Sequence, residues 1–370
     1  MRVRVLYYYS GPHFNTGSPK ALAGLIDCLD RSHFEPLFLA SLDGPLVEAL
    51  AARGVETVRG QVGSVTYRRP LAGLRQIRRQ ATLLRSSRVD LVHVNEFGWN
   101  TDLVFGAWMC GIPVILHVHN AMSVDLRNLN RIMARKVLVV SEAQKAAIAH
   151  FERIRHKCEV LYNAVDLVAC SRGRSVRRAL GLADGQLVVG TVAQLCERKG
   201  IDLILDVARV LLLEFPQLVF LVAGPPGYHE EAFAERMMRM AQDAVFDGRV
   251  RFLGPRTDVP DLLASMDVFL LPTRAEPFGI AVVEAMAAGV PVVASDVGGI
   301  REIVSSAELG WTVPPDSVGG FTDALRTVLR LPDRGRAVGD RGRRSLYGRF
   351  DADTIRRKLE GLYRSLIARP

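Results

Sequence analysis

The sequence has few cysteines and no long apolar run. Its five cysteines are odd in number and scattered, without a C-x-x-C pair, which argues against a disulfide framework or a cysteine zinc site and suits a reducing cytoplasm. The longest weakly polar run, residues 104–116, is shorter than a membrane-spanning helix and contains a proline. Residues 1–11 alternate basic and apolar side chains and lack a small-residue cleavage site. We therefore expect neither a secretory signal nor a transmembrane helix.

Acidic residues are missing from residues 68–88, which hold seven arginines. The first 170 residues carry a net charge of +7, against +2 for the remaining 200. We interpret the block as a surface helix whose apolar face packs on the domain core; the alternative is a basic face that docks on anionic lipid or an acidic acceptor. No helix-turn-helix, zinc-finger or aromatic RNA-binding motif is present, so we expect no nucleic-acid partner. The predicted apolar face consists of Leu71, Leu74, Ile77, Ala81 and Leu84.

Strand-like apolar runs alternate with amphipathic stretches along the whole chain, which is typical of a parallel sheet covered by helices on both faces. A first series of such runs extends over residues 3–141, and a second extends over residues 186–295. A polar, arginine-rich segment, residues 166–185, separates them. The pattern predicts an α/β protein of two doubly wound domains.

Ligands of open parallel sheets bind at the carboxyl ends of the strands, so the residues that follow each strand are the candidates for a site. One such stretch, residues 276–295, reads EPFGIAVVEAMAAGVPVVAS and holds two carboxylates among apolar residues. We expect its helix to start near Gly279 and to end at Gly289. A buried ionised carboxylate is costly unless it is paired, so Glu284 needs a partner in the chain or a ligand.

The start of this helix predicts an anion site. The free N–H groups of Phe278, Gly279 and Ile280 would point out of the helix end, and a glycine there permits close approach of a ligand. Glu276 and Glu284 would accept hydrogen bonds from hydroxyl groups on either side. A nucleotide-sugar fits this arrangement, with its diphosphate at the helix start and its ribose at Glu284.

The same stretch, extended to residue 304, resembles the Glu-x7-Glu signature of retaining GT-B glycosyltransferases of family 4, also called group 1. Further blocks resemble the family in the expected order: PVILHVHNA, VLVVSEAQKAAI, VLYNAVD, VGTVAQLCERKGIDLILDVA and VRFLGPRTDVPDLLASMDVFLLPT. The resemblance implies two Rossmann-like domains with an interdomain cleft. It implies an acceptor-binding domain over residues 1–170, a nucleotide-sugar-binding domain over residues 171–348, and a C-terminal helix, residues 349–370, that returns to the first domain.

The resemblance also implies roles for residues. Glu284 would bind the ribose, and Glu276 would contact the transferred sugar near its reacting carbon. The backbone N–H groups of Phe278, Gly279 and Ile280 would bind sugar and phosphate. Each carboxylate has a structural alternative: Glu284 as a core carboxylate paired with an arginine, and Glu276 as a cap of the helix start.

Further roles fall on residues outside this helix. Lys199 would neutralise the diphosphate as the leaving group departs, unless it is a solvated turn residue. His119, at a strand end, would face the donor sugar, or be a satisfied strand-end histidine. We expect His117 to point to the other face of its strand and to be structural. Gly17 matches the second glycine of the family's Gly-Gly loop beside the phosphates. Asn163 and Asp166 are interpreted as turn residues, with a donor-side role as the alternative.

Two positions depart from the family pattern. Gln194 stands where an arginine is usual, and we hypothesise that Arg198, next to Lys199, partly compensates for the lost charge. A single Gly17 lies between Thr16 and Ser18 in the glycine loop.

We expect no metal and no cofactor other than the nucleotide-sugar co-substrate. No paired histidine or cysteine spacing occurs, and the Asp-x-Asp at residues 351–353 is interpreted as the start of the last helix. The predicted activity is retaining transfer of a sugar from a UDP- or GDP-sugar to an acceptor hydroxyl of a lipid-linked glycan, a glycolipid or a polysaccharide precursor. The predicted location is cytoplasmic, with peripheral contact to the inner face of an anionic membrane. The alternatives are a GT-B sugar-nucleotide epimerase and a catalytically weak sugar-nucleotide-binding subunit.

Overall fold

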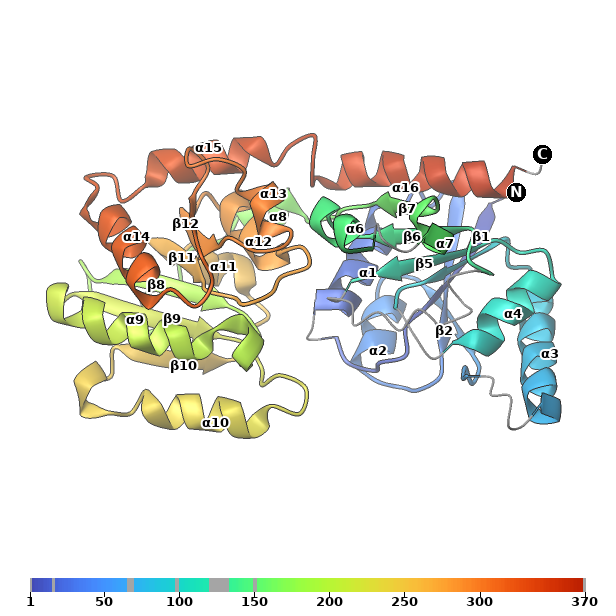
Figure 1. Cartoon of the computed structure of the whole chain (residues 1–370), viewed down its shortest axis with the longest axis horizontal. Helices are drawn as coiled ribbons and strands as arrows, with labels where there is room; N and C mark the ends of the chain where they lie inside the picture. The colour runs from blue at the N-terminus through green and yellow to red at the C-terminus, as the bar shows by residue number, and fades with distance from the viewer. Residues whose placement is uncertain are drawn as a thin grey trace. The chain divides into compact units, whose positions relative to one another are not determined.

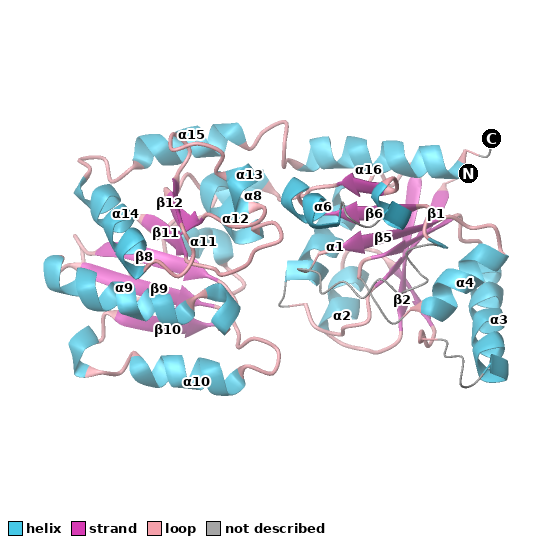
Figure 2. Cartoon of the chain, in the orientation of Figure 1, coloured by secondary structure: helices cyan, strands magenta, loops and turns pink. Residues whose placement is uncertain are grey.

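The computed structural model describes residues 2–14, 17–64, 70–96, 100–119, 133–148 and 152–368. The chain forms two compact units. The N-terminal unit consists of Met1–Ala164 together with Ala352–Pro370, and the C-terminal unit consists of Val165–Asp351. Each unit is a parallel sheet covered by helices, as Figures 1 and 2 show. The prediction of an α/β fold with two doubly wound, Rossmann-like domains is confirmed.

The N-terminal unit contains a seven-stranded parallel sheet in the order β3-β2-β1-β4-β5-β6-β7. Strands β1, β4 and β5 are almost wholly apolar and buried, as expected for a sheet covered on both faces. The strands are β1 (Val3–Tyr8), β2 (Phe34–Ala40), β3 (Glu56–Arg59), β4 (Leu91–Val94), β5 (Val114–Val118), β6 (Lys136–Val139) and β7 (Cys158–Val160). The helices are α1 (Gly17–Cys28), α2 (Pro45–Ala51), α3 (Pro70–Ser86), α4 (Thr101–Met109), α6 (Glu142–Ile148), α7 (Glu152–Arg155) and α16 (Ala352–Ile367).

Helix α16 follows the C-terminal unit in sequence but packs against α1 of the N-terminal unit. Its Tyr363 is fully buried there, and its hydroxyl lies 2.8 Å from that of Tyr7 in β1. The contact pattern divides the chain after Ala164 and after Asp351.

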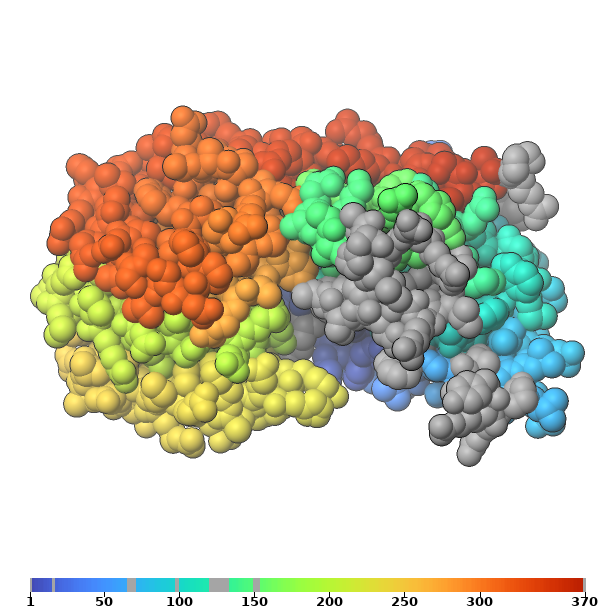
Figure 3. Space-filling view, viewed as in Figure 1, coloured from blue at the N-terminus to red at the C-terminus, as the bar shows by residue number. Residues whose placement is uncertain are grey.

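The C-terminal unit contains a six-stranded parallel sheet in the order β10-β9-β8-β11-β12-β13. Figure 3 shows the side chains of α9, α10 and α14 closing over one face of this unit. The strands are β8 (Leu187–Val192), β9 (Leu218–Ala223), β10 (Val250–Gly254), β11 (Val268–Leu271), β12 (Val292–Ser295) and β13 (Trp311–Val313). The helices are α8 (Leu167–Ser171), η1 (Glu197–Lys199), α9 (Ile201–Glu214), α10 (Glu231–Met240), η2 (Ala244–Phe246), α11 (Val259–Leu263), α12 (Ile280–Ala287), α13 (Ile300–Ile303), α14 (Val318–Arg330) and α15 (Arg336–Ser345).

Within the arginine-rich block, α3 extends over Pro70–Ser86, and its apolar face is only partly covered. Ala81 and Leu84 are buried, whereas Leu71 and Leu74 are exposed. The expectation that all of this face packs on the core is therefore wrong for the first turn of α3. Gly106 of α4 lies against the middle of α3, at Ile77, Gln80 and Ala81.

Candidate active site

Two loops meet at the carboxyl edge of the C-terminal sheet, where the strand order reverses between β8 and β11. Lys199 ends the short helix η1 after β8, and Glu276 lies in the loop between β11 and α12. The Lys199 ammonium forms an ion pair with Glu276 Oε2, and the two side chains are 14% and 10% exposed. Two residues that the sequence singled out separately are therefore in direct contact and largely shielded from water.

Backbone contacts hold the two loops together. The carbonyl oxygen of Arg198 accepts hydrogen bonds from Thr273 Oγ1 at 3.0 Å and from the Arg274 N–H at 2.8 Å. The Arg198 guanidinium donates to the Ala275 carbonyl at 3.0 Å, directly before Glu276. Gly200 has φ +68°, and a Cβ at this position would lie 2.0 Å from the Pro272 carbonyl oxygen. Only glycine therefore permits this approach of the two loops.

Arg274 anchors the second loop through charge. Its guanidinium contacts both carboxylate oxygens of Asp202 in α9, at 2.9 and 2.7 Å, and Nε lies 2.7 Å from Asp316 Oδ1. The hydrogen bonds to Asp202 raise the pKa of Arg274 above its usual range, so the guanidinium stays charged. Bidentate pairs of this kind fix geometry as well as charge. The residue was not predicted from the sequence, because both partners are distant in the chain.

Helix α12 begins at Ile280 after Gly279, whose φ of +116° is in the left-handed region. No side chain caps this helix start. Within the described part of the chain, the N–H groups of Gly279 and Ile280 donate to no acceptor. Phe278, in contrast, does interact with another residue. The Phe278 side chain is buried and packs edge-on against Phe350, with ring centroids 5.4 Å apart. The helix end thus offers two backbone donors beside the Lys199–Glu276 pair.

A glycine pair after β12 supports the Glu276 loop from behind. The Gly299 N–H donates to the Glu276 carbonyl at 3.0 Å. A Cβ on Gly298, whose φ is +49°, would lie 2.0 Å from the same oxygen, and one on Gly299 would lie 2.7 Å from Phe278 Cα. Sequence reasoning gave these glycines no role, although two adjacent glycines after a predicted strand were the signal for a close backbone approach.

Glu284 lies on the least buried side of α12, with Ala281 and Ala288. Glu284 is half-buried and interacts with other groups of the protein, so it is not an isolated buried carboxylate. The charge of Glu284 affects Cys170 in α8. Burial, followed by the negative charge of Glu284, raises the pKa of the Cys170 thiol to about 12. Asp166 begins α8 and caps it, its carboxylate accepting from the Ala169 N–H at 2.8 Å.

The N-terminal unit holds the other predicted site residues. His119 follows β5, and its Nε2 lies 2.8 Å from Asn95 Oδ1. Burial lowers the pKa of His119 to about 3, although Asn163 acts in the opposite direction. Gly17 is exposed at the start of α1, and a Cβ there would meet no atom within 4 Å.

The expectation that His117 points to the other face of its strand is wrong. Residues two positions apart in a strand share a face, and the His117 and His119 ring centroids are 4.1 Å apart. His117 is fully buried beside the predicted site histidine rather than on the opposite side of the sheet.

The residues of the two units match two consecutive families. Residues 174–345 match the family described as Glycosyl transferases group 1, and residues 17–168 match Glycosyltransferase Family 4. The chain belongs to the family-4 type of GT-B glycosyltransferases.

Relatives of this glycosyltransferase support the assignment. The chain is 32% identical over 193 residues to the lipopolysaccharide core biosynthesis mannosyltransferase LpsB of Rhizobium meliloti (strain 1021), covering 52% of this chain and 55% of that protein. It is 34% identical over 214 residues to the D-inositol 3-phosphate glycosyltransferase of Mycobacterium bovis (strain BCG / Pasteur 1173P2), covering 57% of this chain and 41% of that protein. The matches thus span about half the length of these curated relatives. The crystal structure of Anabaena Alr3699/HepE with UDP and glucose superposes with a TM-score of 0.82 at 22% identity, covering 98% of this chain and all of that one.

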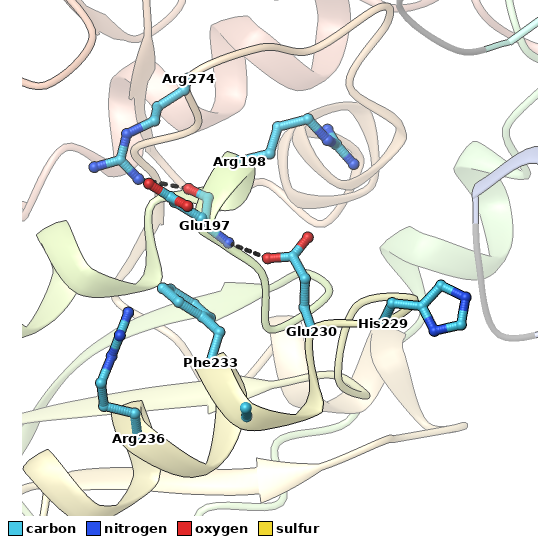
Figure 4. A pocket seen from close by; sticks show the side chains of 8 residues that line it. Glu197, Arg198, His229, Glu230, Phe233, Arg236 and Arg274 are labelled. Atoms are coloured by element: carbon cyan, nitrogen blue, oxygen red, sulfur yellow. Dashed lines mark hydrogen bonds between the residues drawn. The ribbon is translucent and has the colours of Figure 1, made fainter.

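An open pocket of about 660 Å³ lies beside η1 in this glycosyltransferase. Figure 4 shows Glu230 at the start of α10, with its carboxylate turned toward the Glu197 N–H, which donates to it at 2.8 Å. Arg198, His229, Arg236 and Arg274 also line the pocket. Sequence reasoning did not single out the loop after β9 that supplies His229 and Glu230.

The described ranges contain no cluster of three histidine, cysteine, aspartate or glutamate residues able to hold a metal ion. None of the helices in these ranges is long and apolar enough to cross a membrane.

Proposed function

We propose that the protein transfers a hexose or related sugar from a UDP- or GDP-sugar to an acceptor hydroxyl, with retention of anomeric configuration. The observation that carries the proposal is the Lys199–Glu276 ion pair beside the open N–H groups of Gly279 and Ile280. A cation and a helix N-terminus at one place are suited to a diphosphate leaving group. The relative solved with UDP and glucose supports a uridine donor.

Each side chain then has a distinct task. Lys199 stabilises the negative charge that develops on the leaving diphosphate. Glu276 accepts hydrogen bonds from the transferred sugar once the diphosphate draws Lys199 away from it. Glu284 binds the ribose hydroxyls from its half-buried side of α12. The chain supplies no nucleophile in this scheme, so departure and attack occur on the same face of the sugar.

The residues of the N-terminal unit complete the proposal. His119 accepts a hydrogen bond from the donor sugar, and Gly17 leaves the backbone at the start of α1 accessible to the phosphates. The acceptor is a lipid-linked glycan, a glycolipid or a polysaccharide precursor. The basic N-terminal half supports an anionic or membrane-bound acceptor, and the mannosyltransferase relative in lipopolysaccharide core biosynthesis supports a glycan acceptor. No metal is required in this scheme, because Lys199 and the helix end supply the positive potential.

The donor site predicts selective binding of one nucleotide. We expect one of UDP, GDP and ADP, with its sugars, to raise the melting temperature of the wild type, because binding to the folded state alone stabilises it. Glu284→Ala should remove most of this shift, and Arg198→Ala should reduce it if Arg198 replaces the missing cation at Gln194. Glu308→Ala changes an exposed carboxylate of the same unit and is the matched control. Binding that is unaffected by Glu284→Ala would contradict the ribose role, and epimer formation without acceptor would contradict transfer.

The first part of α3 is proposed to contact an anionic membrane. An open groove of about 640 Å³ runs between β3 and α3, and its lining includes four arginines and no acidic residue. The exposed Leu71 and Leu74 lie on the same helix and could enter the headgroup region. The four arginines are Arg59, Arg75, Arg78 and Arg79.

Flotation with vesicles tests this contact. We expect binding to vesicles rich in phosphatidylglycerol and little binding to phosphatidylcholine alone. Each basic residue near such a surface contributes about 1 kcal/mol, so Arg75→Gln/Arg78→Gln/Arg79→Gln should weaken binding roughly a hundredfold. The control Arg172→Gln/Arg178→Gln/Arg344→Gln removes the same charge from exposed positions of the C-terminal unit. Equal loss in both triple variants would reduce the effect to net charge and contradict a docking face.

A further inference from the structure

A chain of buried polar side chains crosses the N-terminal unit and ends beside His119. The hydroxyls of Tyr7 and Tyr363 are 2.8 Å apart, and the Tyr363 hydroxyl lies 2.6 Å from His93 Nδ1. His93 Nε2 lies 3.3 Å from His117 Nδ1, and the His117 ring stacks at a tilt on that of His119. Tyr7, His93, His117 and Tyr363 are all fully buried. These hydrogen-bonded side chains hold His117 in place, and the His117 ring packs against the His119 ring.

Asn95 settles which nitrogen of His119 carries the hydrogen. The Asn95 amide nitrogen donates to the Ser18 carbonyl at 3.1 Å, and this carbonyl can only accept. The amide oxygen of Asn95 therefore faces His119 Nε2, 2.8 Å away, and must accept its hydrogen. Asn95 itself is fully buried, so water does not compete for either bond. In a neutral His119 the lone pair is then on Nδ1.

That lone pair is shielded from solvent. Within the described part of the chain, neither His119 Nδ1 nor Asn163 Oδ1 has a hydrogen-bond partner of good geometry, and both atoms are hidden from solvent. Asn163 is near enough to act on the pKa of His119. Two shielded acceptors without a donor are an arrangement that a hydroxyl of a bound molecule would complete. Burial and the neighbouring histidine keep His93 and His117 neutral, so neither supplies a charge that would change this state.

We propose that Asn95 is a positioning residue for His119: it fixes the imidazole as the Nε2–H tautomer, so that Nδ1 accepts a hydrogen bond from a hydroxyl of the sugar substrate. The inference rests on the proposed function for the identity of that hydroxyl, but not for the tautomer. The contact with Ser18 also ties His119 to the first turn of α1, beside Gly17. Tyr363 and His93 affect His119 only indirectly, because they hold His117 in place.

Nitrogen NMR of protein labelled with ¹⁵N-histidine tests the tautomer directly, because protonated and unprotonated ring nitrogens have well separated shifts. We expect wild-type His119 to be a single, neutral Nε2–H tautomer from pH 8 to pH 5. Asn95→Ala should give a mixture of tautomers. Asn95→Asp keeps an acceptor for Nε2–H and adds a negative charge, so it should retain the tautomer and form imidazolium at a higher pH than the wild type. A mixed tautomer in the wild type, or an unchanged one in Asn95→Ala, would overturn the proposal.

Turnover of UDP-glucose and GDP-mannose, measured as hydrolysis and as transfer to a membrane extract, tests the consequence. We expect Asn95→Ala to lower kcat/KM at least tenfold. Asn95→Asp should recover activity at high pH, and the acid limb of its pH–activity profile, where activity falls as the pH is lowered, should lie at a higher pH than in the wild type. Gln80→Ala removes another buried amide of the same unit and should lose stability without a change in this limb. A wild type without turnover on either donor would count against the proposed function, whereas the NMR result decides the role of Asn95 separately. Should Asn95→Ala fail to fold, the Asn95→Asp titration still decides it.

Discussion

Replacing Lys199 with methionine is expected to lower sugar transfer by a factor of about 100 to 1000, the usual cost of losing one group that stabilises developing charge. The same change also leaves Glu276, only 10% exposed, without its cation. Removing one partner of a largely buried pair destabilises a protein by about 3 kcal/mol, because the other charge remains unpaired. Turnover and urea unfolding, measured on the same preparations, therefore both change, and the two effects have to be separated.

A double-mutant cycle separates them. Glu276→Gln alone leaves the Lys199 ammonium unpaired, whereas Lys199→Met/Glu276→Gln leaves no charge unpaired and should recover most of the lost stability. Transfer should stay lost in the double variant, because neither the diphosphate nor the sugar regains its partner. Recovery of transfer together with stability would mean that the pair is only structural. Lys136→Met, in the more exposed pair with Glu159, is the matched control and should affect stability by less than about 1 kcal/mol and turnover not at all.

The place of Glu276 was predictable from local patterns. Apolar runs identify the strands, and parallel strands present their carboxyl ends at one edge, which placed Glu276 at a candidate site. Lys199 was singled out only by the resemblance to the family, and its contact with Glu276 was not predicted. The glycine and proline that end α12 were equally readable in sequence, and α12 ends at Ala287, near the predicted position.

Other features depend on contacts between distant segments. Arg274 meets Asp202 from 72 positions away, and Tyr363 meets His93 from 270 positions away, so no periodicity could reveal either pair. The first turn of α3 has the same apolar spacing as the rest of the helix, but its Leu71 and Leu74 are exposed. Amphipathic spacing identifies a face that can be buried; what covers it is decided by the rest of the fold.

Mild acid is expected to unfold the N-terminal unit through its buried histidines. Burial lowers the pKa of His93 and of His119 to about 3, and that of His117 well below its usual value. Unfolding returns all three to about 6.5. The unfolded state therefore binds more protons below that pH, so the stability they contribute is complete above pH 6.5 and is lost as the pH falls toward 3. Each histidine makes the free energy of unfolding change by about 1.4 kcal/mol per pH unit, and the three together make it change by about 4 kcal/mol per pH unit.

Urea unfolding at pH values from 7.5 to 4.5 measures this slope. Paired carboxylates such as Asp202, whose pKa is held down by Arg274 against the effect of burial, release their stabilisation only below about pH 4, so the histidines dominate in this window. His117→Gln should reduce the slope by about a third, although it also lowers stability at pH 7.5. His156→Gln changes an exposed histidine of the same unit and should leave the slope unchanged. A urea midpoint independent of pH between 7.5 and 5 would mean that the three rings gain no protons on unfolding. The neutral state that makes His119 Nδ1 an acceptor would then need another origin than burial.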